Sequence, residues 1–354
     1  MIFNLNLVNF RSYENESFEF NPGVNLIVGP NASGKTNLIE AISLICSLKS
    51  FRLKGGDLIN HQSDFFYIKA IDQLNFQREL SYHVSDNHLS KKYTLNHLEI
   101  KNRSQQRKIP IIIFEPSNLN LVSGSSEKRR DYFDQINQNL FKSYSRILNQ
   151  YKRIIVQRNK LLKDPRSQIH DFFPWNIRLV ETANLIVEKR LELINIINQK
   201  INHVYNKIAK NKIYNIKVEY KTNQNIKNYA NNLLKSLEDN FSLEKKYSYS
   251  LFGPHHDDIV FYFDQREAKS LASRGEIRTL ILVLKIIEAQ LIEENNQTYK
   301  PILLFDDVFS ELDGSRRKYL IEYFQDYQIF ITTTDADIII KDFSKNTNII
   351  LLNN

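Results

Sequence analysis

Residues 29–36, which read GPNASGKT, limit the possible folds of this 354-residue chain more than any other segment. The apolar segment 24–28 before them predicts a buried strand, and residues 36–48 after them carry apolar side chains at helical spacing. In a strand-loop-helix of this kind, backbone N–H groups and the helix N-terminus cradle phosphate oxygens. We therefore predict an α/β protein that binds ATP. The predicted ATP contacts are Gly29, Pro30, Asn31, Ala32, Ser33, Gly34, Lys35 and Thr36.

Phosphoryl chemistry gives separate roles to the charged and hydroxyl groups near this loop. Lys35 is placed to reach the β and γ phosphates, and the Thr36 hydroxyl to ligate Mg²⁺. The apolar segment 302–305 ends in Asp306 and Asp307, and phosphoryl transfer needs a carboxylate near Mg²⁺ and a second group that orients the attacking water. We assign Asp306, with Thr36, to the metal and Asp307 to the water. Lys35, Asp306 and Asp307 are the predicted catalytic residues.

Residue patterns elsewhere predict an α/β domain that a long helical insertion interrupts. Strands are expected at 2–8, 17–20, 65–71, 77–84, 92–100, 110–114, 214–220, 258–263, 302–305, 329–333 and 348–352. Helices are expected at 129–162, 175–209, 275–294 and 313–324, with further helix up to 246 and a short helix after 333. The predicted α/β domain comprises residues 1–116 and 250–354, and the predicted helical arm comprises residues 117–249.

Basic residues are unevenly distributed in a chain whose formal net charge is +8. Residues 126–166 contain eleven basic and four acidic side chains, and so carry almost the whole excess. Such a run is typical either of a solvated helix face or of a surface that follows nucleic-acid phosphates. Candidate DNA contacts in this run are Arg129, Arg130, Arg153 and Arg158. An arginine pair at a helix start can equally form ion pairs with nearby aspartates.

The single cysteine, Cys46, excludes an intrachain disulfide and a cysteine-based zinc site. No apolar run reaches the roughly 18 residues that a membrane-spanning helix needs, and the first residues lack the pattern of a secretory signal. We therefore expect a cytoplasmic protein without a membrane partner.

The segment 255–258, HHDD, contains residue types that ligate metals. Neighbouring side chains on an extended segment point in opposite directions, so they do not share one ion. We expect no metal at this segment.

Two further segments narrow the class of ATP-binding protein. Residues 273–276, SRGE, open the helix expected at 275–294, and residues 310–313, SELD, follow the acid pair. Together with the G-x-x-x-x-G-K-T loop, they resemble the ABC-type ATPase heads. This resemblance implies that Ser273 and Gly275 bind the γ-phosphate of ATP held by a second subunit, and that Asp313 also lies at the nucleotide. Two heads would then enclose two ATP molecules.

Fragments along the chain resemble the RecF family of bacterial recombination mediators still more closely. They are NFRSY at 9–13, SFR at 50–52, FEPSNL at 114–119, RRDYFD at 129–134, QRN at 157–159, GPHHDD at 253–258 and DDVFSELD at 306–313. The resemblance implies an ABC-type head with a helical arm, forming an ATP-dependent homodimer that binds duplex, single-stranded or gapped DNA. It further implies slow, DNA-stimulated ATP hydrolysis, recombinase loading with RecO and RecR, and roles in replication, repair and the SOS response. By the same resemblance, Arg11 and Thr334 contact ATP.

Two departures from the family pattern bear on the ATP cycle. Glu276 stands where the signature usually has glutamine, so that a carboxylate comes near the γ-phosphate and weakens the enclosure of ATP. Asp307 stands where most ABC ATPases have glutamate, and a side chain one methylene shorter suits a slow switch better than a fast motor.

Other P-loop proteins remain as alternatives. An SMC-type head is disfavoured because the chain between Thr36 and Ser273 is too short for a long coiled coil and lacks sustained heptads. A transporter ATPase subunit would not need the helical arm or its basic run. A P-loop kinase for small molecules would have no use for the signature segment.

Overall fold

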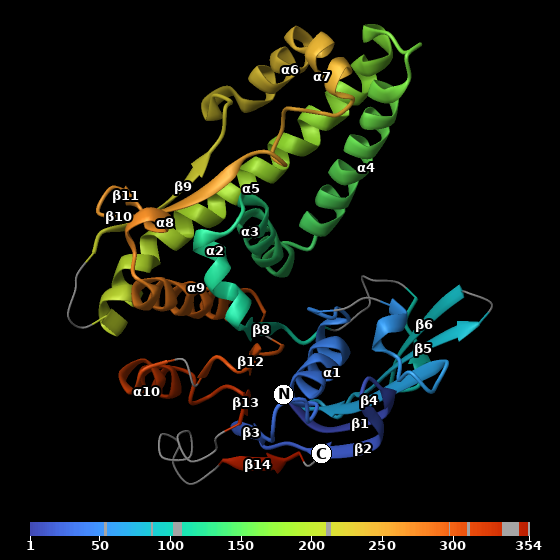
Figure 1. The fold of residues 1–354 in the computed structure, drawn as a ribbon, viewed down its shortest axis with the longest axis vertical. Helices are drawn as coiled ribbons and strands as arrows, with labels where there is room; N and C mark the ends of the chain where they lie inside the picture. The colour runs from blue at the N-terminus through green and yellow to red at the C-terminus, as the bar shows by residue number, and fades with distance from the viewer. Residues whose placement is uncertain are drawn as a thin grey trace. The chain divides into compact units, whose positions relative to one another are not determined.

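A computed structural model of the chain describes residues 1–52, 55–85, 88–101, 108–209, 214–296, 298–309, 312–334 and 347–352. The described residues divide into two compact units, which Figure 1 shows together. Residues 1–116 and 289–354 belong to the first unit, and residues 117–288 belong to the second.

An antiparallel sheet with the strand order β2-β1-β4-β5-β6-β7 forms one layer of the first unit. Its strands are β1 (Ile2–Phe10), β2 (Tyr13–Glu19), β4 (Phe65–Asp72), β5 (Gln77–Ser85), β6 (His88–Leu95) and β7 (Leu98–Glu99). Along β4, fully buried residues alternate with more exposed ones, because one face of the sheet covers the core. The single strand expected at 92–100 is wrong. Asn96 and His97 both have positive φ, so the chain reverses there and forms the β6–β7 hairpin.

A parallel sheet with the order β14-β3-β13-β12-β8 forms the other layer. Its strands are β3 (Val24–Val28), β8 (Ile111–Phe114), β12 (Ile302–Phe305), β13 (Ile329–Thr333) and β14 (Asn348–Leu351). Every residue of β12 and β13 is buried, which agrees with the continuous apolar runs that predicted them. The strands expected at 24–28, 302–305 and 329–333 are confirmed. The short helix expected after 333 lies outside the described residues.

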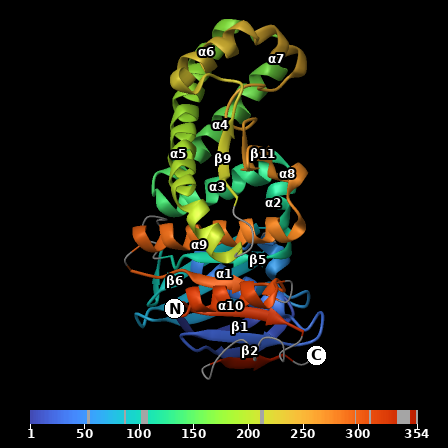
Figure 2. The same ribbon diagram turned by 90° about the vertical axis from the view of Figure 1, so that its left-hand side faces the viewer.

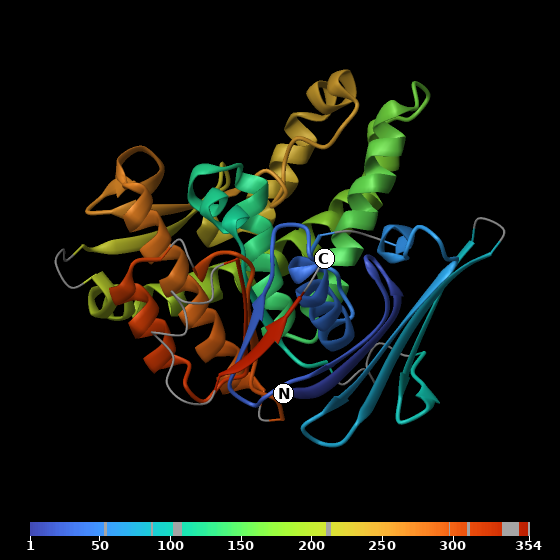
Figure 3. The ribbon, with the colours of Figure 1, turned by 60° about the horizontal axis from the view of Figure 1, so that its bottom comes forward.

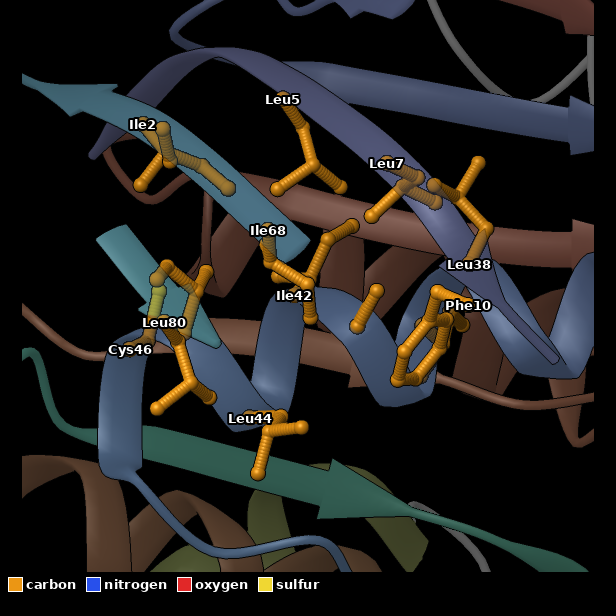
Figure 4. Close-up of a cluster of buried hydrophobic side chains, with 14 of the residues drawn as sticks. Ile2, Leu5, Leu7, Phe10, Leu38, Ile42, Leu44, Cys46, Ile68 and Leu80 are labelled. Carbon is orange, nitrogen blue, oxygen red and sulfur yellow. The ribbon is translucent and has the colours of Figure 1, made fainter. Parts of the chain in front are cut away.

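Helix α1 (Lys35–Ser47) contacts both layers and supplies much of their common core. Figure 3 shows the curved antiparallel sheet with α1 on its inner side, and Figure 4 shows Leu38 and Ile42 of α1 beside Leu7 and Ile68 of that sheet. Burying each such side chain contributes about 1.5–3 kcal/mol. This packing fixes the start of α1, and therefore the preceding loop, next to the end of β3. The first unit also contains η1 (Gly55–Leu58) and α10 (Gly314–Tyr323).

Helices make up most of the second unit. They are α2 (Asn120–Ser123), α3 (Ser126–Leu140), α4 (Tyr144–Lys163), α5 (Ile169–Ala209), α6 (Tyr229–Asp239), α7 (Phe241–Tyr247), α8 (Ala268–Leu271) and the part of α9 (Arg274–Asn295) up to Glu288, with short 3₁₀ helices η3 (Pro116–Leu119) and η4 (Ile226–Asn228). Figure 2 shows strand β9 (Ile216–Lys221) running along the long helix α5. Within the described ranges, no helix is long and apolar enough to cross a membrane.

The continuous helix expected at 129–162 is wrong. The chain turns after Leu140 and begins α4 at Tyr144. The Tyr144 hydroxyl donates a hydrogen bond to Asp134 Oδ1 at 2.6 Å, which holds the start of α4 against α3. No glycine or proline marks this turn, so a tertiary contact sets a boundary that the local pattern does not reveal.

Helix α5 begins before Pro174, whereas we expected a helix from residue 175. Proline is tolerated close to a helix N-terminus because few intrahelical hydrogen bonds are lost there. Phe172 is fully buried and its ring packs 5.0 Å from the ring of Phe241, measured between centroids. This contact stabilises the extra turn ahead of the proline.

Residues 250–288 group with the second unit, although we expected them in the α/β domain. Strand β10 (Asp258–Phe263) pairs with β9 and with β11 (Arg266–Glu267), all antiparallel. Because β9 lies within the helical insertion, this pairing joins residues 258–263 to the arm. The second division of the chain therefore falls after Glu288, inside α9, and not after residue 249.

Candidate nucleotide site

The carboxyl ends of neighbouring parallel strands bring the motifs of the first unit together. Val28 of β3 pairs with Thr333 of β13, and Ile331 of β13 pairs with Phe305 of β12. The G-x-x-x-x-G-K-T loop follows β3, the acid pair follows β12 and Thr334 follows β13. All of them therefore emerge at one edge of the sheet, which is the edge where open parallel sheets bind ligands.

The loop requires glycine at both ends of its pattern. Gly34, the N-cap of α1, has a φ of 94°, a conformation that favours glycine, and its carbonyl oxygen accepts a hydrogen bond from the Tyr13 hydroxyl at 3.0 Å. At Gly29, a Cβ would lie 2.5 Å from Ser33 Oγ and 2.7 Å from the Leu352 carbonyl oxygen. No side chain fits at that distance, so both glycines are needed for the tight path of the backbone into α1.

Lys35 is a buried cation at the start of α1. Its side chain is 5% exposed, and Nζ donates to the carbonyl oxygens of Gly29 at 2.9 Å and Pro30 at 2.8 Å. Within the described part of the chain, no carboxylate forms an ion pair with it. Carbonyl oxygens compensate a buried ammonium only in part. The position therefore fits an anion, and a phosphate bound in the loop would supply one.

Thr36 and Asp306, the two residues that we assigned to Mg²⁺, are in contact at the same edge. Thr36 Oγ1 donates to Asp306 Oδ1 at 3.0 Å, and Thr332 Oγ1 donates to the same oxygen at 3.1 Å. Burial raises the pKa of Asp306, although both hydroxyl donors oppose the shift, and the nearby charge of Asp307 adds to it. A cation would relieve this buried carboxylate. One carboxylate beside one hydroxyl suits Mg²⁺ when phosphates and water supply the other ligands.

Thr332 belongs to this site, although the sequence did not predict it. This residue lies in the buried strand β13, donates to Asp306 and accepts the backbone N–H of Asp307 at 2.9 Å. A hydroxyl within an apolar strand was the available signal, because buried polar groups need partners. Asp307 has a φ of 53° and an exposed side chain. Thr332 thus fixes the backbone from which Asp307 projects to the surface.

Arg11, which the family resemblance placed at ATP, is bound to α1. Its Nε and Nη2 donate to Glu40 Oε2 at 3.1 and 3.0 Å, and Glu40 is fully buried. The ion pair ties the turn after β1 to the helix that begins at Lys35. Thr334 is exposed directly after β13.

Asp313 is the N-cap of α10. Its Oδ1 accepts the backbone N–H of Arg316 at 2.9 Å. Burial acts to raise the pKa of Asp313, but the hydrogen bonds from Arg316 and Ser315 outweigh it and lower the pKa. The preceding signal residues, Ser310 and Glu311, lie outside the described residues.

Ser273 and Gly275, the predicted signature residues, lie at the start of α9 in the second unit. The Ser273 N–H and Oγ donate to Glu276 Oε2 at 2.8 and 2.9 Å, and the Glu276 N–H donates to Ser273 Oγ at 3.3 Å. This reciprocal arrangement is a capping box. The Tyr214 hydroxyl donates to the other carboxylate oxygen of Glu276. The unusual Glu276 is therefore held on the serine that we expected to contact a phosphate.

Arg158 was expected to contact DNA, and this expectation is wrong. Its side chain is 0% exposed and forms an ion pair with Glu244 at 2.5 Å. It also donates to Asn176 Oδ1 at 2.9 Å and to Ser250 Oγ at 2.8 Å. A guanidinium that is enclosed in this way is part of the core of the second unit.

Arg129, another candidate DNA contact, also has a partner within the fold. It is 7% exposed, and its guanidinium donates to both carboxylate oxygens of Asp258, at 2.8 and 2.9 Å. The ion-pair alternative therefore holds here, with an aspartate of β10 as the partner. Arg130 is partly exposed and donates to the Asp257 carbonyl oxygen at 2.7 Å, whereas Arg153 on α4 is exposed.

The two histidines at 255 and 256 do not point in opposite directions, because the chain turns there and is not extended. Their ring centroids are 4.1 Å apart, and both Nε2 atoms lie near the Ser250 carbonyl oxygen, at 3.2 and 3.0 Å. Burial, aided by the neighbouring His256, lowers the pKa of His255 to about 3. Among the described residues, no group of three or more His, Cys, Asp and Glu side chains is placed to hold a metal.

The sequence matches a known family along nearly its whole length. The family model described as "RecF/RecN/SMC N terminal domain" matches residues 1–353. A "DNA replication and repair protein RecF" from Halalkalibacterium halodurans is 33% identical over 347 residues, covering 94% of this chain and 92% of that protein. The protein of the same description from Alkaliphilus oremlandii is 32% identical over 355 residues, covering 93% and 92%.

Solved structures agree with this assignment. The structure of "the recombination mediator protein RecF-ATPrS" matches with a TM-score of 0.86 and 26% identity, covering 99% of this chain and 96% of that chain. A crystal structure of an Smc head matches with a TM-score of 0.53 and 17% identity, covering 99% and 93%, and so supports the fold alone. The chain therefore belongs to the RecF family, and its fold is an ABC-type ATPase head with an inserted, mainly helical arm.

Proposed function

We propose that this protein is an ATP-dependent DNA-binding protein that acts in DNA replication and in recombinational repair of single-strand gaps. Binding of Mg-ATP to residues 29–36 brings two copies together on DNA, and slow hydrolysis releases them. The observation that carries the proposal is Lys35, a buried ammonium whose described partners are carbonyl oxygens. It lies in a chain whose relatives are named RecF, one of them in a structure with ATP.

The residues at the sheet edge suit ATP hydrolysis to ADP and inorganic phosphate. Thr36 and Asp306 would hold Mg²⁺, which when bound would neutralise phosphate charge. Lys35 would bind the phosphate oxygens, and Asp307 would orient the water that attacks the γ phosphorus as the bond to the β–γ bridging oxygen breaks. The short, exposed Asp307 side chain supports a slow reaction.

The signature segment supports a homodimer. Ser273 and Gly275 present the N-terminus of α9, and a helix N-terminus attracts phosphate. In the proposed dimer, these residues and Asp313 would contact ATP bound by the other copy, with Arg11 and Thr334 at its own nucleotide. The DNA-binding form would work in the cytoplasm with RecO and RecR to load recombinase, and DNA would stimulate the weak ATPase.

Sedimentation of the purified protein tests this proposal. We expect monomers without nucleotide, and dimers that bind a gapped duplex when Mg-ATP is present. Binding should weaken steeply with salt, because phosphate contacts release counterions. A monomer that is indifferent to both ligands would overturn the proposal and favour a P-loop enzyme that acts on a small molecule.

The variant Asp307→Asn separates binding from hydrolysis. It keeps the backbone turn that Thr332 supports, so ATP binding should persist while dimers accumulate. Asp64→Asn, which changes an exposed aspartate of the same unit, is the matched control and should behave like the unaltered protein. A variant that binds ATP but stays monomeric would contradict the ATP-driven dimer.

A further inference from the structure

One face of α4 carries only positive charge. Its charged residues Arg146, Lys152, Arg153, Lys160 and Lys163 are all exposed, and the helix contains no acidic residue. At 3.6 residues per turn, these five positions fall within an arc of roughly 120°. Arg146, Arg153 and Lys160 recur every seven residues, so they form a row about 21 Å long.

The opposite face of α4 is fixed by packing. Tyr144, Leu148, Tyr151, Ile154 and Leu162 are buried, and α4 lies against α5. Figure 1 shows α5 along one side of α4, and α4 also contacts α3 and α7. The buried arginine of the same helix, Arg158, belongs to this inner face. The row of exposed cations is therefore held toward solvent by the packing behind it.

Among the described residues, the exposed cations of α4 form no ion pair, although the charge of Lys152 acts on the Asp131 carboxyl and opposes the rise in its pKa that burial causes. The neighbouring helix α5 differs, because its exposed face carries Glu181 and Glu188, and its Lys189 pairs with Glu192. The excess of positive charge is thus a property of one helix face and not of the whole unit.

Helix stability does not account for this face. Arg146 lies in the first turn of α4, where the helix dipole disfavours a cation. Lys160 and Lys163 are three residues apart, and like charges at that spacing repel each other. The dipole favours only the two lysines in the last turn. Residues that oppose local stability without a partner in the fold indicate a binding surface.

We propose that the exposed face of α4 binds the phosphodiester backbone of DNA. This proposal rests on the proposed function and identifies the surface that contacts DNA. Of the arginines first considered on α4, Arg153 belongs to this surface and Arg158 does not. The other members of the surface are Arg146, Lys152, Lys160 and Lys163. A straight row of cations on a rigid helix matches a regular line of phosphates and reads no base, so binding is independent of sequence.

The test compares two triple variants that lose the same charge. Arg146→Gln, Arg153→Gln and Lys160→Gln together remove the row, and glutamine keeps helix propensity. The control combines Arg178→Gln, Lys207→Gln and Lys235→Gln, which lie exposed on α5 and α6 of the same unit. Affinity for a labelled duplex and for a labelled single strand is measured at several salt concentrations with Mg-ATP present. Unfolding and ATP titrations verify that both variants remain folded.

Removal of the row should weaken DNA binding roughly 10- to 100-fold at 0.15 M salt. Each lost contact lowers the slope of log affinity against log salt by about 0.9 on duplex or about 0.7 on single strand. The control variant should have the same slope as the unaltered protein. The DNA form whose slope falls is the form that the face contacts.

DNA binding by the unaltered protein separates a wrong contact surface from a wrong function. If the unaltered protein binds DNA and the two triple variants match each other, the α4 assignment is overturned and the proposed function stands. If the unaltered protein binds neither DNA form at low salt, the DNA-binding function is overturned and the α4 surface with it.

Discussion

Lys35 and Arg158 are both buried cations, but the protein supplies a counter-charge to only one of them. Arg158 forms an ion pair with buried Glu244 and has neutral partners in Asn176 and Ser250. Lys35 contacts two carbonyl oxygens, and no described carboxylate pairs with it. A buried cation with its counter-charge belongs to the fold, whereas one without it has room for an anion from solution. Burial alone therefore does not distinguish a structural cation from a binding one, whereas the presence of a counter-charge does.

The largest effect on stability is expected from Arg158→Ala. The substitution leaves the buried Glu244 carboxylate without its counter-charge, which should lower the free energy of unfolding of the second unit by about 3–5 kcal/mol. Arg153→Ala, five residues earlier on the exposed face of the same helix, should change it by about 0.5 kcal/mol at most. Denaturant titration measures both. Similar losses in the two variants would refute the distinction between the buried and exposed arginines.

Lys35→Ala should weaken ATP binding and leave the free energy of unfolding almost unchanged. We expect ATP affinity to fall about 10- to 100-fold, corresponding to about 1.5–3 kcal/mol for a charged hydrogen-bonding contact. Unfolding without nucleotide should change little, because no carboxylate loses its partner. Titration with a fluorescent ATP analogue measures the first quantity and denaturant the second. Lys318→Ala, which removes a 77% exposed lysine from α10, is the control, and equal ATP affinity in the two variants would contradict an anion site at Lys35.

Local sequence patterns predict the elements around the nucleotide loop, but they do not show which basic residues of α4 are buried. The strands before the loop at 29–36 and before the acid pair were predicted correctly, because continuous apolar runs are typical of buried parallel strands. Charge counts along 126–166 did not separate buried Arg158 from exposed Arg153, because both lie on one helix and only tertiary packing selects the inner face. The turn after Leu140 and the supporting role of Thr332 likewise depend on contacts between distant segments.

The buried carboxyl of Asp306 should make the free energy of unfolding depend on pH. Burial raises its pKa in the folded state above the ordinary value of 3.8, so its contribution to stability is present below that value and is lost as pH rises through the raised pKa. Asp306→Asn should therefore raise the free energy of unfolding of the nucleotide-free protein at pH 7, by about 0.5–2 kcal/mol. The gain should vanish below pH 3.8, where the aspartate is protonated in both states.

Denaturant titrations between pH 3 and pH 8 measure this difference. The substitution should also weaken Mg-dependent ATP binding, because the anionic ligand is lost. Asp326→Asn, at an exposed position of the first unit, should show neither effect. A variant that is less stable than the unaltered protein at pH 7 would show that Asp306 is compensated in the fold, as Arg158 is.

The smallest effect on stability is expected from a substitution of Glu276, whose own carboxylate already occupies the donors at the start of α9. Its carboxylate accepts from the N–H and hydroxyl of Ser273, the groups that a phosphate from a second copy would use. Glu276→Gln keeps the capping box, because glutamine also serves at that position, but it removes the negative charge from the start of α9. The free energy of unfolding should change by a few tenths of a kcal/mol, while ATP-dependent dimers should become about two- to fivefold tighter, the equivalent of about 0.3–1 kcal/mol.

Sedimentation at graded protein concentration measures the dissociation constant of the dimer. Ser273→Ala, which loses the helix cap and about 1 kcal/mol of stability, should weaken the dimer. Weaker dimers in Glu276→Gln would mean that the carboxylate supports the closed state, and Glu276 would then resemble the compensated Arg158 site rather than the open position at Lys35.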